Sequence, residues 1–522
     1  MTEPTGSLSE AAIRGSAWTT AQTVINKFAV LIASLVLARL LDPADYGIAF
    51  IATTVGAFFF VLAPWVLNDL LVSDPRGFER NAGTALLAGV GTALVLGLLM
   101  IASIPLLRLF EPRYAGFGLL LAVVALRPLA DAWMAVPWAA LRIRLQYARI
   151  AIIDGSMQLA GTAAAVLMAV QGAGPMTLVL PPSMVLFAQG SAYWFVARGT
   201  VPLKPQRTLF IPIYRRFTVA AASQYLNNVV KVLELLVLAW LATPAAVGLF
   251  AFAFQLSSQA NVVIANQTAG VIQPILSHIN DQPKRQYQAF LRALRLIGCV
   301  GVPLSVVQGA AGFPVFRIFF GAKWDGAVAI FLVLSFMQAF IFVATPIMVM
   351  LKAQGRFRLI FAWQLSHVLV GACLIVAMVK LGTGFFALLP VLVDLPTTGD
   401  TALPLAASIA GTFMWGIGCP YALHAAGQPA GASWRSVLAA LVQPWPAALG
   451  GGLLVGMAPH ILKPITGDLY ANIATIVLAA PIALAAIALA AASNIDSRRE
   501  LKQFARALNR RFRLVRNGTS VR

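Results

Sequence analysis

Residues 35–47 read LVLARLLDPADYG and residues 236–248 read LVLAWLATPAAVG, so one apolar stretch with a Pro-Ala-x-x-Gly ending is written twice in this chain. Aligned at an offset of 201, the two stretches are identical at eight of thirteen positions. In each copy we expect the proline to end an apolar helix and the glycine to allow a tight turn. The repetition predicts a duplicated unit rather than a binding motif.

A second pair of similar segments supports the duplication. LRIRLQYARI begins at Leu141 and LKAQGRFRLI begins at Leu351, an offset of 210, and both are basic, amphipathic starts of an apolar segment. Two such pairs in the same order predict a repeated unit of six helices. Because six is even, both copies would have the same orientation in a membrane.

The composition is that of a membrane protein. The 522 residues are 60% hydrophobic and 11% charged, with a mean hydropathy of +0.83, whereas soluble domains carry roughly a quarter charged residues. The net charge of +20 does not point to nucleic acid, because nine of the 38 basic residues lie in the tail 498–522, as expected for a cytoplasmic tail. The three cysteines stand alone in apolar segments and predict no disulfide or metal site.

Fourteen segments are long and apolar enough to cross a bilayer as helices. They are 17–41, 47–72, 83–107, 116–137, 148–170, 176–197, 217–241, 247–275, 291–316, 327–350, 358–380, 401–424, 434–458 and 468–492. The apolar part of 382–400 is short and suits an interfacial or re-entrant segment. We therefore expect an all-α polytopic membrane protein with about 14 transmembrane helices, in which two parallel-repeat six-helix bundles surround a central cavity and two further helices follow.

The expected domains are a first bundle (1–200), a second bundle (201–425), two additional C-terminal helices (426–493) and a basic cytoplasmic tail (494–522). Sorting the lysines and arginines by loop places 28 on the side of both termini, six on the opposite side and four within spans. This asymmetry predicts that both termini are cytoplasmic.

Polar side chains inside the predicted spans mark the expected cavity, because ionisable groups there cost about 2.5 to 3.5 kcal/mol each. At about 100° per residue they form stripes on otherwise apolar helices. The stripes comprise Gln224, Asn227, Asn228, Lys231 and Glu234 on the seventh span, Gln255 and Gln259 on the eighth, Gln22, Asn26 and Lys27 on the first, and Arg127 and Asp131 on the fourth. The duplication alignment brings Asn26 onto Asn227.

Two interpretations of the charged residues remain open. Lys231 with Glu234, and Arg127 with Asp131, are spaced to neutralise each other within a helix and to stabilise packing alone. Alternatively, their cations line a water-filled cavity for an anionic ligand. Lys27 has no carboxylate within one turn, so it is the best single candidate for such contact, unless its side chain extends to the membrane surface.

Motifs for catalysis are missing from the sequence. It contains no G-x-x-x-x-G-K-[ST] phosphate loop, no H-E-x-x-H and no G-x-S-x-G, and its four histidines have no ligand-like spacing. We expect no cofactor, no metal and no enzymatic activity.

Several stretches resemble the oligosaccharide flippases, the polysaccharide transporter branch of the multidrug/oligosaccharidyl-lipid/polysaccharide flippase superfamily. The similarity runs from about residue 9 to 380. It rests on RGSAWTTAQTVINKFAVLIASLVLARLLDPADYG from Arg14, VGLFAFAFQLSS from Val247, QPILSHINDQPKRQYQAFLRALR from Gln273, GAKWDGAVAIF from Gly321 and LKAQGRFRLI from Leu351.

The resemblance implies that the protein moves undecaprenyl-diphosphate-linked oligosaccharide across the bacterial inner membrane by alternating access, for lipopolysaccharide, capsule or exopolysaccharide assembly. A polymerase and export machinery of the same pathway are implied partners. By position, Lys27, Arg127 and Lys231 would form the cationic part of the cavity, with the amides facing the sugar. Glu234 and Asp131 would carry a coupling proton or hold the cations in place.

Three rival functions are compatible with the same pattern. A small-molecule exporter of the multidrug and toxin extrusion type shares the duplicated architecture, but its cavity should favour carboxylates and aromatic residues. A membrane polymerase or ligase of lipid-linked sugars should carry a large external loop with Arg or His. A peptidoglycan-precursor flippase differs only in its substrate.

Overall fold

The computed structural model shows a helical protein, and no strand is present in the part of the chain that it describes. The described residues are 29–30, 32–59, 67, 71–72, 77–105, 116–144, 146–198, 205–206, 208–211, 214, 238–381 and 401–492. Contacts divide the chain into two compact units, Met1–Gly248 and Leu249–Arg522. The domain boundaries expected at residues 200, 425 and 493 remain predictions.

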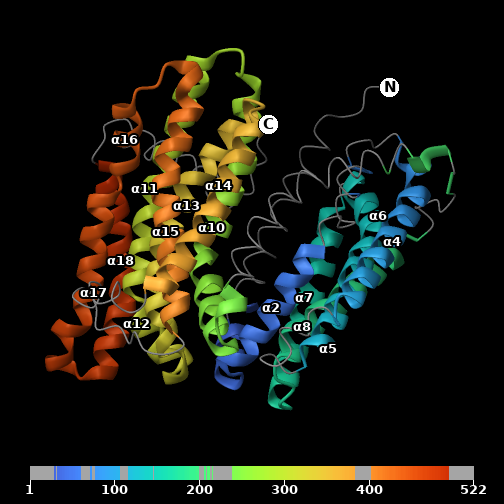
Figure 1. Ribbon diagram of the computed structural model, residues 1–522, viewed down its shortest axis with the longest axis horizontal. Coiled ribbons are helices and arrows are strands. Elements are labelled where there is room, and N and C mark those ends of the chain that lie inside the picture. The colour runs from blue at the N-terminus through green and yellow to red at the C-terminus, as the bar shows by residue number, and fades with distance from the viewer. Residues whose placement is uncertain are drawn as a thin grey trace, which may run out of the picture. The chain divides into compact units, whose positions relative to one another are not determined.

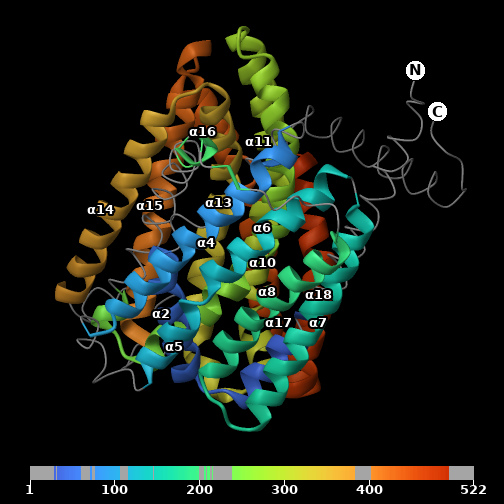
Figure 2. The same ribbon diagram turned by 90° about the vertical axis from the view of Figure 1, so that its right-hand side faces the viewer.

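The first unit is a bundle in which neighbouring helices pack along their lengths. Its helices are α2 (Pro43–Phe59), α4 (Phe78–Ala102), α5 (Phe117–Val124), α6 (Arg127–Ile143), α7 (Tyr147–Val170) and α8 (Met176–Val196). Helix α6 packs between α4 and α8, and α7 packs on α8 (Figure 2). Small buried residues such as Ala82, Ala85 and Ala139 form the contact between α4 and α6, and small side chains let membrane helices approach closely.

The second unit is built around α11 and α13. Its elements are α11 (Pro283–Ala310), α12 (Gly312–Val315), a π-helical turn (Phe316–Phe320), α13 (Asp325–Ala353), α14 (Phe357–Leu381), α15 (Ala402–Gly427), α16 (Trp434–Val442), α17 (Trp445–Thr466) and α18 (Asp468–Ala492). Helix α11 packs against α13, α17 and α18 (Figure 1). The last two helices are therefore attached to this unit through α11. Helix α10 (Pro244–His278) begins in the first unit and continues into the second.

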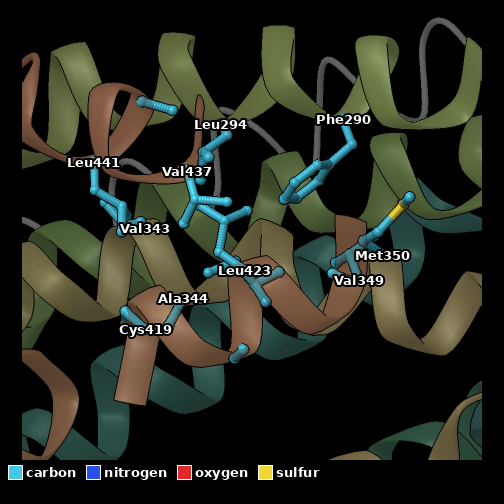
Figure 3. Close-up of a cluster of buried hydrophobic side chains, with 14 of the residues drawn as sticks. Phe290, Leu294, Val343, Ala344, Val349, Met350, Cys419, Leu423, Val437 and Leu441 are labelled. Carbon is cyan, nitrogen blue, oxygen red and sulfur yellow. The ribbon is translucent and has the colours of Figure 1, made fainter. Parts of the chain in front are cut away.

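The core of the second unit is apolar, and α11, α13, α15 and α16 all contribute to it. Phe290 on α11, Met350 on α13, Leu423 on α15 and Val437 on α16 are all buried and point toward one another (Figure 3). No charged side chain belongs to this cluster of the described residues. Side chains from segments far apart in the sequence thus hold α11, α13, α15 and α16 together.

The predicted fold class, an all-α polytopic membrane protein, is confirmed. Eight helical segments of the described chain are long and apolar enough to cross a membrane. They are Phe78–Ala102, Phe117–Ile143, Tyr147–Val170, Pro283–Ala310, Ala322–Ala353, Ala402–Ala430, Trp434–Pro464 and Asp468–Ala492. Most of the predicted spans 17–41 and 217–241, and all of 382–400, lie outside the described residues.

The described parts of the repeated segments, 35–47 and 238–248, have the same local structure. Each apolar helix ends in the same way, since the amide of Leu41 donates to Leu37 O at 2.8 Å and the amide of Ala242 donates to Leu238 O at 2.9 Å. Pro43 then begins α2, and Pro244 begins α10.

The second pair of segments repeats its hydrogen bonds too. The amide of Gln146 donates to Leu141 O at 2.9 Å, and the amide of Arg356, 210 positions later, donates to Leu351 O at 3.0 Å. Each of these hydrogen bonds joins residues five positions apart, as at many helix C-termini, and satisfies a carbonyl at the helix end before the next helix begins. The local geometry of both pairs therefore supports the duplication.

Our expectation for the glycine of each repeated segment was wrong. Gly47 is the fifth residue of α2 and Gly248 the fifth of α10, so neither forms the turn. Within the first unit, a Cβ on Gly47 would collide with the carbonyl oxygen of Pro244, and a Cβ on Gly248 would collide with that of Pro43. Both glycines are needed because the two helix starts approach each other closely, and a sequence taken one segment at a time does not reveal that contact.

Candidate functional site

The structure places four of the twelve predicted site residues. Arg127 and Asp131 lie on α6, and Gln255 and Gln259 lie on α10. The other eight fall outside the described residues, so their positions remain predictions. They are Gln22, Asn26, Lys27, Gln224, Asn227, Asn228, Lys231 and Glu234.

Arg127 lies at a break within a membrane span. The segment Phe117–Ile143 is apolar enough to be one span, yet α5 ends at Val124 and α6 begins at Arg127 after a turn at Ala125 and Leu126. Pro128, which has no amide hydrogen, is accommodated in the first turn of α6. The predicted continuous helix 116–137 is thus two helices, and the guanidinium is carried by the first residue of the second one.

The break favours an anion near Arg127. The helix dipole gives the start of α6 a partial positive charge, and the Arg127 guanidinium adds a full one. Interrupted helices in transporters present such ends to their substrates. The sequence pattern alone did not reveal this break, although the Arg-Pro pair at residues 127 and 128 is a signal for a helix start.

Asp131 lies one turn after Arg127 on the same helix, as predicted, and both side chains are partly buried. The two groups attract each other electrostatically. Within the described part of the chain no direct salt bridge joins them. The attraction supports the interpretation that Asp131 holds the cation in place, and the lack of direct contact leaves the guanidinium donors available to a ligand.

The amides on α10 divide between two faces. Gln255 is exposed and Gln259 is partly exposed, and the Gln259 Nε2 lies 3.3 Å from Gln255 O. Asn261 points about 120° to 160° away from them around the helix, and its Nδ2 donates to Gln338 Oε1 of α13 at 3.0 Å in a buried contact. Gln255 and Gln259 are thus on a face that other groups can reach, while Asn261 serves packing.

A third polar cluster, which the sequence analysis did not single out, lies between α7 and α8. The Oδ1 atom of Asp154 accepts hydrogen bonds from Tyr193 and, at 3.2 Å, from Gln189 Nε2. Asp154 is the only carboxylate in the apolar helix Tyr147–Val170. A lone acidic residue within a span was the signal that could have identified it.

These features define the class of the protein: an all-helical, multi-pass membrane protein with a locally repeated structure and a charged group at a helix break. The fold resembles that of solved transporters. It matches the lipid II flippase MurJ in an inward closed conformation with a TM-score of 0.61, covering 90% of this chain and 98% of that one at 14% identity. It also matches a multidrug resistance MATE family transporter of the MOP superfamily, in an inward-facing conformation, with a TM-score of 0.58, covering 78% and 96% at 12% identity.

The chain belongs to the family described as polysaccharide biosynthesis protein, whose profile matches residues 36–329, more than half of the 522 residues. The expected membership of a polysaccharide branch is thereby confirmed, together with the fold of the MOP superfamily. No curated protein matches this chain significantly.

Proposed function

We propose that the protein is a flippase that moves undecaprenyl-diphosphate-linked oligosaccharide from the cytoplasmic to the periplasmic leaflet of the bacterial inner membrane. The observation that carries the proposal is that a chain of the polysaccharide biosynthesis family spans 98% of a lipid II flippase structure. Lipopolysaccharide, capsule or exopolysaccharide assembly would consume the transported unit.

The cation at the α5–α6 break supports an anionic substrate. A diphosphate carries several acceptor oxygens, and Arg binds such groups through paired hydrogen bonds. In the proposed cycle Arg127, Lys27 and Lys231 attract the diphosphate. The amides Gln22, Asn26, Gln224, Asn227, Asn228, Gln255 and Gln259 exchange hydrogen bonds with sugar hydroxyls, and Asp131 and Glu234 hold the cations or carry a coupling proton.

The proposed transport is by alternating access. The lipid tail stays in the membrane while the charged head group crosses through a water-filled cavity lined by these residues. A polymerase and export machinery would then receive the unit on the periplasmic side.

The leaflet in which lipid-linked repeat units accumulate tests this function directly. In a deletion strain we expect the units to accumulate on the cytoplasmic side, because their head groups cannot cross the apolar core without the protein. Accumulation of unpolymerised units on the periplasmic side would instead identify a polymerase or ligase. Accumulation of lipid II on the cytoplasmic side, with lipid-linked oligosaccharide unaffected, would identify a peptidoglycan-precursor flippase.

The cavity assignment is tested by the double variant Lys27→Ala with Lys231→Ala. We expect polymer export to be lost while the protein still reaches the membrane, because both proposed point charges for the diphosphate are removed. A matched control is Lys284→Ala with Lys463→Ala, which removes two exposed lysines outside the proposed cavity. Full export by the first variant would contradict the assignment.

A second candidate function is export of small molecules, and the match to a multidrug resistance transporter favours it. Drug susceptibility separates the two. A deletion strain that becomes sensitive to cationic drugs while its lipid-linked units cross normally would support the exporter.

A further inference from the structure

Asp154 lies deep enough in a membrane span to need an explanation. It is the eighth residue of α7, about 10 Å from the start of that helix at 1.5 Å per residue, and α7 is one of the apolar segments able to cross a membrane. A charged carboxylate in such a segment costs about 2.5 to 3.5 kcal/mol on insertion scales. A partner cation, access to water or a bound proton must therefore offset this cost.

The described residues supply no cation for this carboxylate. Helix α7 packs on α8 and α6. Helix α8 carries no charged residue, and Tyr193 is its only titratable group. The charged groups of α6 are Arg127, Asp131 and Arg142, and none of them forms an ion pair with Asp154.

The basic groups that lie nearest in sequence, Arg149, Arg144 and Arg142, form no ion pair with Asp154 in the described chain. The guanidinium of Arg142 lies 5.1 Å from the centre of the Trp138 ring. Arg149, on α7 itself, donates to Gln146 Oε1 at 3.1 Å. Tyr147, the other titratable group of α7, has no hydrogen bond to Asp154 among the described residues.

The hydrogen bonds leave one oxygen of Asp154 open. Tyr193 and Gln189 both donate to Oδ1, and within the described chain Oδ2 has no hydrogen-bond partner. A proton needs only one such lone pair. A metal cation of the Mg²⁺ or Ca²⁺ kind takes about six or more oxygen ligands, and this cluster offers far fewer.

The same cluster joins two helices. Tyr193 and Gln189 belong to α8, so their bonds to Asp154 fasten α8 to α7. Further along, a Cβ on Gly161 of α7 would collide with Val185 of α8, so the helices are also in close contact there. Hydrogen bonds to an ionised carboxylate are roughly twice as strong as those to a neutral group, so proton uptake would weaken the fastening.

We propose that Asp154 is a proton-binding site separate from the residues of the predicted cavity. Its protonation loosens the contact that Tyr193 and Gln189 make between α7 and α8. The site lies within the first unit alone. Its role in transport rests on the proposed function, whereas proton binding itself does not.

Infrared spectroscopy of the purified full-length protein, titrated with acid, tests the proton site without a substrate. We expect the carbonyl band of protonated carboxyl groups to grow as the pH falls and to lose one component in Asp154→Asn, which keeps an acceptor oxygen for Tyr193. Asp468→Asn is the matched control, because Asp468 is an exposed carboxylate in a surface ion pair with Lys463. A band unchanged by Asp154→Asn overturns the proposal.

Two further measurements keep the proposal testable if Asp154→Asn does not fold. Tyr193→Phe removes one donor to the carboxylate, so the pH midpoint of the band must move, and an unchanged midpoint overturns the proposal. Replacing K⁺ by Na⁺ at constant ionic strength should leave the midpoint where it is. A sodium-dependent shift would overturn the proton site in favour of a sodium site.

The transport arm separates this inference from the proposed function. If both hold, translocation of lipid-linked units by Asp154→Asn loses its dependence on pH. If the Asp154 component of the infrared band is lost in that variant but translocation of the lipid-linked units does not depend on the protein, the proton site stands and the proposed function fails. If translocation depends on the protein but keeps its full pH dependence in Asp154→Asn, the link to transport is overturned.

Discussion

Single residues decide whether the two repeated helix starts can meet. Gly47 and Gly248 each face a backbone carbonyl of the other segment, at Pro244 and Pro43 respectively. A backbone group cannot rotate away as the end of a flexible side chain can. The repeated motif therefore encodes a close contact of main chains.

Replacing Gly47 with Ala should destabilise the folded protein by about 1 to 3 kcal/mol, because the added methyl group overpacks a site enclosed by backbone. Thermal unfolding of the purified protein measures the effect. Gly91→Ala is the matched control, since the added Cβ meets nothing within 4 Å in α4 and alanine favours a helix by up to about 1 kcal/mol. Equal melting temperatures for both variants would contradict the close contact.

At the level of elements, the turn between α13 and α14 closes the end of α15. The last carbonyls of a helix have no partner within it. Here Gln354 Nε2 donates to Ala426 O at 2.9 Å, and Arg356 donates to Ala425 O and, at 3.5 Å, to Gln428 Oε1. The basic segment 351–360, which resembles residues 141–150, therefore has a structural role in addition to its predicted place on the cytoplasmic side.

Arg356→Ala should lower the free energy of unfolding by about 1 to 3 kcal/mol, because a partly buried carbonyl of α15 loses its donor. Arg358→Ala removes the same charge from an exposed position two residues later and should change the stability by less than about 0.5 kcal/mol. Chemical or thermal unfolding of the two purified variants compares them. If Arg358→Ala is the more damaging change, charge rather than helix capping explains the segment.

At the level of the whole molecule, the distribution of basic residues predicts the orientation. The first turn of α11 carries Lys284 and Arg285, whereas the last turn of α17 carries Lys463, which pairs with Asp468 at 3.1 Å. An odd number of predicted spans separates Lys284 from Lys463 if 382–400 does not cross the membrane. They are then on opposite sides.

Cysteines introduced by Lys284→Cys and Lys463→Cys should react with a membrane-impermeant thiol reagent from opposite sides, with position 463 labelled in intact cells and position 284 only in inverted vesicles. Cys299 and Cys419 are buried, so Cys373→Ala alone removes the exposed native thiol. Labelling of both positions from one side would mean that 382–400 adds a crossing.

The sequence by itself determined the fold class and the repeat. In lipid every backbone polar group must be satisfied within its own segment, so long apolar runs specify helices without reference to their neighbours. Hydropathy was less accurate at helix ends: the predicted span 291–316 begins eight residues after the observed helix starts at Pro283 and runs past its end at Ala310. Helical hydrogen bonds continue into polar residues before the apolar run, so hydropathy does not mark the start of the helix. The spacing of Arg127 and Asp131 was likewise predictable, since both belong to one helix.

Only the tertiary structure decided what depends on contacts between helices. Asp154 accepts hydrogen bonds from Gln189 and Tyr193, which lie 35 and 39 positions later in the sequence. Gly47 contacts Pro244, which belongs to the second copy of the repeated segment. The break before Arg127 is likewise visible only in the structure, because a hydropathy profile does not respond to two residues of turn. Periodicity and hydropathy indicate which faces of each helix contact lipid or water, whereas the partners of a buried group depend on which helices pack together.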